Sequence, residues 1–97
     1  MQYLLTETIE RDTVNTIVEA DDIDDMSKVI KNFMREAMDD AEFDPATSKG
    51  EDDDWGYNEN SDLNTISAWY SGNSNYDWEV SLLSDVKVIN HKDLIRL

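Results

Sequence analysis

Cysteine is absent from the chain, and histidine occurs once, at His91. The lack of thiols excludes disulfides, thiolate metal sites and cysteine nucleophiles. There is no Gly-x-Ser-x-Gly motif, so nothing in the sequence supports a nucleophilic triad. Carboxylates are so abundant that a pair of them does not mark an active site. We therefore expect a protein that is not an enzyme.

The chain also lacks long apolar runs, phosphate-binding loops and basic clusters. No stretch of about 18 apolar residues occurs, so we expect no membrane span, and residues 1–7 do not have the pattern of a signal peptide. With three glycines in all, there is no glycine-rich phosphate loop. The eight basic residues are scattered, whereas direct nucleic-acid binding requires a basic stripe.

Acidic residues are present in large excess. Twenty-three Asp and Glu stand against eight Lys and Arg, which gives a formal net charge of −15. Such a protein repels nucleic acid and anionic lipid and attracts basic surfaces. We therefore expect a basic protein partner, with no direct binding to nucleic acid and no membrane binding. The simpler alternative is that the acids form a solvated surface that keeps the protein soluble.

Hydrophobic residues make up 39% of the sequence and include nine aromatic side chains, which argues for a packed core and against disorder. The length fits a single domain over residues 1–97. Residues 1–20 alternate in the period-two manner of strands, and a short polar break at 10–12 predicts a hairpin. The alternative is a helix capped by Asp12, but five of residues 13–19 are β-branched and disfavour it.

Residues 21–41 form the clearest predicted helix. Asp21 or Asp22 can cap it, and two further acids lie in the first turn, where the helix dipole favours anions. Apolar residues recur at spacings of three and four and predict a face directed at the core. This stripe comprises Ile23, Met26, Ile30, Phe33 and Ala37, widened by Val29, Met34, Met38 and Ala41.

Residues 42–62 have little periodicity and predict a long acidic loop, in which Phe43, Trp55 and Tyr57 can hold the chain against the core. Residues 63–97 predict a second hairpin and a C-terminal segment with a short strand at 86–89 and a helical turn from Asn90 or Asp93. The predicted fold is α+β: a single small domain in which an antiparallel sheet of two hairpins (ββαββ) carries one amphipathic helix.

The charge is concentrated between Glu36 and Asp62, where eleven carboxylates and one base give a formal charge of −10. Asp39 and Asp40 follow the helix, where its dipole disfavours anions. Acids placed against local preference, followed by a loop with aromatic residues, indicate an anionic binding surface. The predicted partner-binding residues are Glu36, Asp39, Asp40, Glu42, Asp44, Glu51, Asp52, Asp53 and Asp54, together with Asp77 and Glu79 if their strand face is open.

The acid clusters do not match a metal-binding motif. An EF-hand loop that starts at Asp52 would need glycine at its sixth position, but Gly56 is fifth and Tyr57 is sixth. No other register works. We therefore predict no metal site and no cofactor.

Mimicry of DNA explains the charge in a different way. Double-stranded DNA carries one negative charge per roughly 1.7 Å of its axis. Carboxylates accept paired hydrogen bonds from arginine, as phosphates do. A small protein with carboxylates on a helix, a loop and a strand would compete with DNA for the basic groove of a DNA-binding protein.

The chain resembles the small acidic phage proteins that mimic DNA and disable host defence. The resemblance lies in its size, its charge, its lack of cysteine and its acids at 21–22, 24–25, 39–40 and 51–54. Within that group it looks most like the anti-CRISPR inhibitors that keep a CRISPR surveillance complex from target DNA. These proteins share no common motif, so no residue role is carried over. The resemblance implies action in the host bacterial cytoplasm, without catalysis or cofactor.

Three alternatives remain open on the sequence. The first is an anti-restriction protein, which would use the same surface against another complex. The second is an acidic interaction module that binds a basic partner without mimicking DNA. The third is a hydrolase or metal-dependent enzyme, which would require a pocket around His91 or a carboxylate pair.

Overall fold

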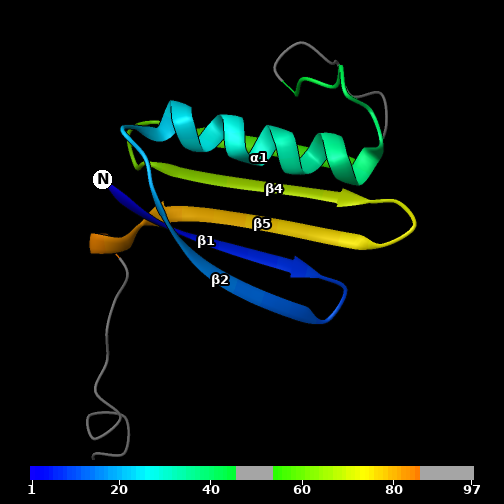
Figure 1. The fold of residues 1–97 in the computed structure, drawn as a ribbon, viewed down its shortest axis with the longest axis horizontal. Helices are drawn as coiled ribbons and strands as arrows, with labels where there is room; N and C mark the ends of the chain where they lie inside the picture. Colours follow the sequence, from blue (N-terminus) through cyan, green and yellow to red (C-terminus); the bar gives the residue numbers. More distant parts are fainter. Residues whose placement is uncertain (46–53, 86–97) are drawn as a thin grey trace, which may run out of the picture.

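The computed structural model describes residues 1–45 and 54–85, which form an antiparallel sheet with a helix across one face (Figure 1). The predicted α+β class is confirmed. The elements in chain order are β1 (Gln2–Ile9), β2 (Asp12–Glu19), α1 (Ile23–Met38), β3 (Trp55–Asn60), β4 (Thr65–Ser71), β5 (Asn75–Leu82) and the 3-10 turn η1 (Leu83–Asp85). The predicted strand at 86–89, the helical turn from Asn90 or Asp93, and His91 lie outside the described residues.

The number of strands corrects the predicted ββαββ description. The sheet has five strands, because the predicted loop 42–62 contains β3, which pairs antiparallel with β4. The sequence Trp-Gly-Tyr-Asn-Glu-Asn has no β-branched residue, and its glycine weakens strand propensity. In the sheet, the indole of Trp69 covers Gly56 so closely that a Cβ there would approach Trp69 Nε1 to 2.2 Å.

The strand order is β2-β1-β5-β4-β3, so β5 is the central strand. The two predicted hairpins are present as β1–β2 and β4–β5, and they join through antiparallel pairing of β1 with β5. This pairing brings together segments from the two ends of the described chain. It also fixes which residues of β1 and β5 share a face of the sheet.

α1 is shorter than predicted at both ends. At its start, Asp22 accepts a hydrogen bond from the Asp25 N–H at 3.1 Å, as an N-cap does. At its end, Asp39 adopts the left-handed conformation with φ 55°. The N–H groups of Asp39 and Asp40 donate to the carbonyls of Glu36 and Arg35, at 3.2 and 3.0 Å, and this Schellman motif ends the helix.

The core lies between α1 and the sheet. The helix buries Ile23, Met26, Ile30 and Met34, whereas the predicted stripe residues Phe33 and Ala37 are only half-buried at its flank. The sheet and the segment after the helix contribute Tyr3, Leu5, Phe43, Ile66, Ala68, Trp78 and Val80. None of the helices in the described residues has the length and apolar character that spanning a membrane requires.

α1 packs on β4 and β5 and does not reach across to β2 (Figure 1). β2 is exposed along almost its whole length. Ile17, which pairs with Leu4 on the face away from α1, is 57% exposed, and Val14, which pairs with Glu7 on the α1 face, is 58% exposed although it is apolar. The face of the sheet that carries α1 therefore has a covered part and an open part. The boundary between them runs along β1.

Candidate acidic interaction surface

The described residues carry the whole net charge of the chain. They contain nineteen Asp and Glu against four Lys and Arg, which again gives −15. Of the predicted partner-binding residues, Glu51, Asp52 and Asp53 lie outside the described residues. The remaining eight divide between two faces of the molecule.

One group lies at the C-terminal end of α1. Glu36, Asp39, Asp40 and Glu42 are all exposed there. Asp54 joins them because it precedes Trp55, whose ring packs edge-on against Phe43 with centroids 5.0 Å apart. We call the five exposed carboxylates of Glu36, Asp39, Asp40, Glu42 and Asp54 the acidic end.

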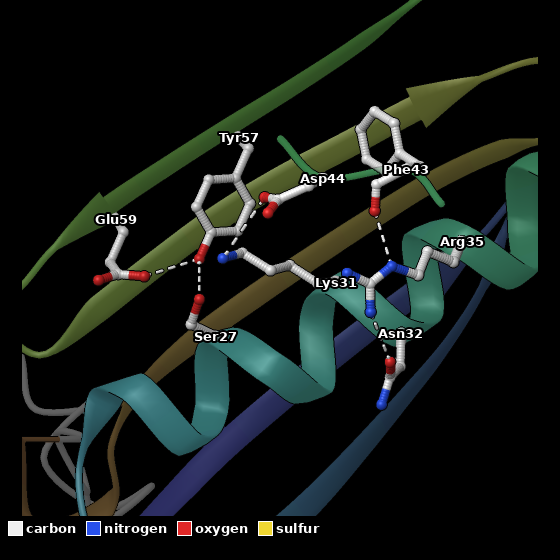
Figure 2. Close-up of polar contacts among 8 residues, drawn as sticks. All are labelled: Ser27, Lys31, Asn32, Arg35, Phe43, Asp44, Tyr57 and Glu59. Carbon is white, nitrogen blue, oxygen red and sulfur yellow. Dashed lines mark hydrogen bonds and ion pairs between the residues drawn. The ribbon is translucent and has the colours of Figure 1, made fainter. Parts of the chain in front are cut away.

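The segment after α1 is held against the helix by specific contacts (Figure 2). Arg35 Nε donates to the Phe43 carbonyl at 2.7 Å, and its Nη1 donates to Asn32 Oδ1 at 3.1 Å. Lys31 forms an ion pair with Asp44 at 3.7 Å. Phe43 itself is only 7% exposed. The acidic end therefore has a defined conformation, although Asp44 differs from its neighbours because it is half-buried and paired with a base.

β3 is held to α1 by the hydroxyl of Tyr57 (Figure 2). This hydroxyl lies 2.8 Å from Ser27 Oγ and donates to Glu59 Oε1 at 2.7 Å. Burial raises the pKa of the Tyr57 hydroxyl well above its ordinary value, and the hydrogen bond to Glu59 acts in the same direction. The hydroxyl therefore stays protonated and able to donate at pH values just above 10, where an exposed tyrosine begins to ionise.

Asp77 and Glu79 lie on the other face of the sheet. They alternate along β5 with Trp78 and Val80, which are buried on the α1 side. Both acids are exposed, and Glu79 accepts a hydrogen bond from Ser67 at 3.0 Å. The structure therefore does not bring these two residues together with the acidic end.

A second acidic group lies at the N-terminal end of α1, where Asp22 and Asp25 have capping roles. The sixteen residues of α1 separate the two groups by about 24 Å. Lys28, Lys31 and Arg35 lie between them, and Lys28 pairs with Asp25 at 3.9 Å. Along the helix the charge thus runs acidic, basic, acidic, and is not a continuous acidic stripe.

Sequence reasoning missed Glu7, which occupies a core-facing position of β1. Tyr3 and Leu5 on the same face are buried, and Glu7 accepts a hydrogen bond from Trp78 Nε1 at 2.7 Å. The signal was available, because a charged residue in the apolar register of a strand requires a partner or a function. Among the described residues, no group of three acidic or histidine side chains is placed to hold a metal ion.

Comparison with protein-family models, with curated proteins and with solved structures yields no match. The function is therefore inferred from the charges and contacts of the chain itself.

Proposed function

We propose that this protein is a non-enzymatic inhibitor that presents a DNA-like acidic surface and blocks nucleic-acid binding by a host defence complex. The complex proposed is a CRISPR surveillance complex, which makes the protein an anti-CRISPR acting in the bacterial cytoplasm. The observation that carries the proposal is the acidic end: five exposed carboxylates at the end of α1 and beside it, where Arg35 and Phe43 hold the chain after the helix in place. A solubilising surface does not require such fixed placement.

The electrostatics of the acidic end suit a basic partner. Within the described residues, the carboxylates of Glu36, Asp39 and Glu42 form no ion pair with Lys or Arg. They are therefore available to arginine and lysine side chains that otherwise contact phosphate. Because the segment is already ordered, binding requires little further loss of conformational entropy.

The test measures competition with DNA. Purified protein is added to CRISPR surveillance complexes and to restriction enzymes at about 150 mM salt, and binding of labelled target DNA is followed by fluorescence anisotropy. We expect the protein to displace target DNA from a CRISPR complex, and DNA in excess to displace the protein. If no basic nucleic-acid-binding complex retains the protein at this salt concentration, the proposal is wrong.

A charge-matched pair of variants tests the surface. The first replaces four acidic-end residues: Glu36→Gln, Asp39→Asn, Asp40→Asn and Glu42→Gln. The second neutralises four exposed acids outside the predicted partner-binding set: Glu19→Gln, Asp21→Asn, Asp62→Asn and Asp85→Asn. Both variants have a net charge of −11, so only the position of the charge differs. We expect the first to lose inhibition and the second to keep it.

The alternation of charge along α1 favours a second candidate, an acidic module that binds a basic protein without imitating DNA. The outcome that selects it is a stable complex that excess DNA does not displace. An anti-restriction protein would instead inhibit the restriction enzyme and leave the CRISPR complex unaffected.

A further inference from the structure

A groove lies beside α1, on the part of the sheet that the helix leaves open. It has a volume of about 280 Å³, and its lining combines the carboxylates of Glu7 and Glu36 with the side chains of Ile9, Phe33, Tyr76 and Trp78. No basic side chain is among the described residues that line it. Two acids with no basic partner among residues 1–45 and 54–85 therefore border an apolar floor.

Glu7 is fixed in position, but no basic side chain in the described part of the chain forms an ion pair with it. Antiparallel pairing places it directly opposite Trp78 on the α1 side of the sheet. Its Oε2 accepts the indole N–H at 2.7 Å, and Oε1 has no hydrogen-bond partner in the described chain. A half-buried carboxylate with one neutral donor is stabilised further when a cation binds to it.

The floor of the groove suits a flat cation. The rings of Tyr76 and Trp78 are nearly parallel, with centroids 5.6 Å apart and an interplanar angle of 14°. Tyr76 also stacks against Tyr70, with ring centroids 6.0 Å apart, and both Tyr76 and Phe33 are half-buried, so neither residue is completely covered. A guanidinium group stacks on aromatic rings and donates forked hydrogen bonds to carboxylates, whereas an ammonium group is a compact and more strongly hydrated charge.

The groove is open on the side of β2. Val14 pairs with Glu7 across β1 and β2, and its exposure of 58% shows that α1 does not cover this position. Asp12, which pairs with Ile9, adds a further acid at the same side. An extended basic segment can therefore lie along β2 and direct a side chain into the groove.

We propose that this groove binds an arginine side chain from an extended basic segment of the partner protein. The guanidinium group lies between Glu7 and Glu36 and stacks on Tyr76. The proposal rests on the proposed function in one respect, because it assumes that the partner protein is basic. It adds a specific side-chain pocket to a surface otherwise recognised by overall charge.

The test uses the peptide acetyl-Gly-Arg-Gly-amide as the probe, with the lysine and citrulline peptides for comparison. Titrations are followed by nuclear magnetic resonance of the indole N–H groups. Trp78 donates to Glu7 and reports on the groove, whereas Trp69 lies on the opposite face and is an internal control. We expect a saturable shift of the Trp78 signal with the arginine peptide and none with citrulline, which is neutral.

Charge-matched variants complete the test. We expect Glu36→Gln to weaken arginine-peptide binding about tenfold, and the double variant Glu7→Gln with Glu36→Gln to abolish the saturable shift. The control Asp62→Asn with Asp85→Asn removes the same charge at exposed positions that do not line the groove and should change affinity less than twofold. Equal weakening by the control, or equal binding of the lysine peptide, overturns the proposal. Because no partner complex is used, the result is independent of whether the protein inhibits a defence complex.

Discussion

Asp39 occupies a position at the end of α1 that is energetically unfavourable for aspartate. It adopts a left-handed conformation that glycine and asparagine tolerate better, and its charge lies at the helix end where the dipole disfavours anions. We expect Asp39→Asn to stabilise the fold by about 0.5–1 kcal/mol, measured by urea unfolding. The control Asp62→Asn removes one charge far from that helix end. If both variants are stabilised equally, relief of general repulsion is the cause and the local explanation fails.

Tyr57 provides a prediction about pH. Its pKa is raised above the ordinary value of 10.0, so the folded chain keeps this proton at pH values where the unfolded chain loses it. The free energy of unfolding should therefore be insensitive to this group below pH 10 and fall as the pH rises above it. In Tyr57→Phe the part of the decline in unfolding free energy that comes from Tyr57 should disappear. At neutral pH the same variant should be less stable by about 1 kcal/mol, because it loses the hydrogen bonds with Ser27 and Glu59.

The measurement compares unfolding curves of the two proteins from neutral to alkaline pH. Tyr3 is buried in both, and its own raised pKa contributes equally to each curve. The difference between the two curves therefore isolates Tyr57. Identical alkaline slopes would show that the Tyr57 hydroxyl does not retain its proton in the folded state.

At the scale of elements, Arg35 provides one of the contacts between α1 and the following segment. Arg35→Lys keeps the positive charge but loses the planar Nε–H donor to the Phe43 carbonyl. We expect a loss of about 1 kcal/mol and faster hydrogen exchange at the amides of residues 40–45. Lys28→Arg, at an exposed position on the same helix, is the matched control. Unchanged exchange in Arg35→Lys would mean that Phe43 packing alone orders the segment.

Local patterns in the sequence predict most of the elements. Period-two alternation locates β1, β2, β4 and β5, and the helical stripe locates α1. β3 was missed because Gly56 and the asparagines carry no strand signal, and Gly56 fits only because Trp69 from the neighbouring strand covers it. The end of α1 was misplaced because Asp39 takes the position that a glycine usually marks. The error at β3 arises from a contact between residues that are distant in sequence. The error at the end of α1 arises from a backbone conformation that is unusual for aspartate.

The candidate site was predicted in part. The sequence identifies the acids around the end of α1, but their spacing does not show that Asp44 pairs with Lys31 or that Asp77 lies on the opposite face. The alternation of side chains along β5 predicts that Asp77 and Trp78 lie on opposite faces of the sheet. Which of these two faces carries α1, and with it the acidic end, is known only from the structure. Glu7 and Glu36 line one groove because β1 pairs with β5 and α1 packs on β5, an arrangement that no local pattern reveals.

At the scale of the whole molecule, repulsion within a net charge of −15 opposes folding. Raising the salt concentration from about 10 to about 150 mM shortens the screening length from about 30 to about 8 Å. We expect stabilisation of about 1 kcal/mol, or a rise in Tm of about 4–8 °C, measured by calorimetry. The variant with four neutralised acidic-end residues should show a smaller rise. A Tm that does not change with salt would show that the charges are too widely spaced to matter.

The central position of β5 also affects how the protein is made. Glu7 and Trp78 meet in the sheet but lie 71 residues apart in the chain, so the ribosome needs roughly 4–14 s to synthesise the segment between them. During that interval β1 and β2 can form a hairpin, but the strand that β1 needs on its other side does not yet exist. Completion of the sheet must therefore wait until β5 has left the ribosome. Until then the free edge of β1 is open to chaperones, or to pairing with another nascent chain.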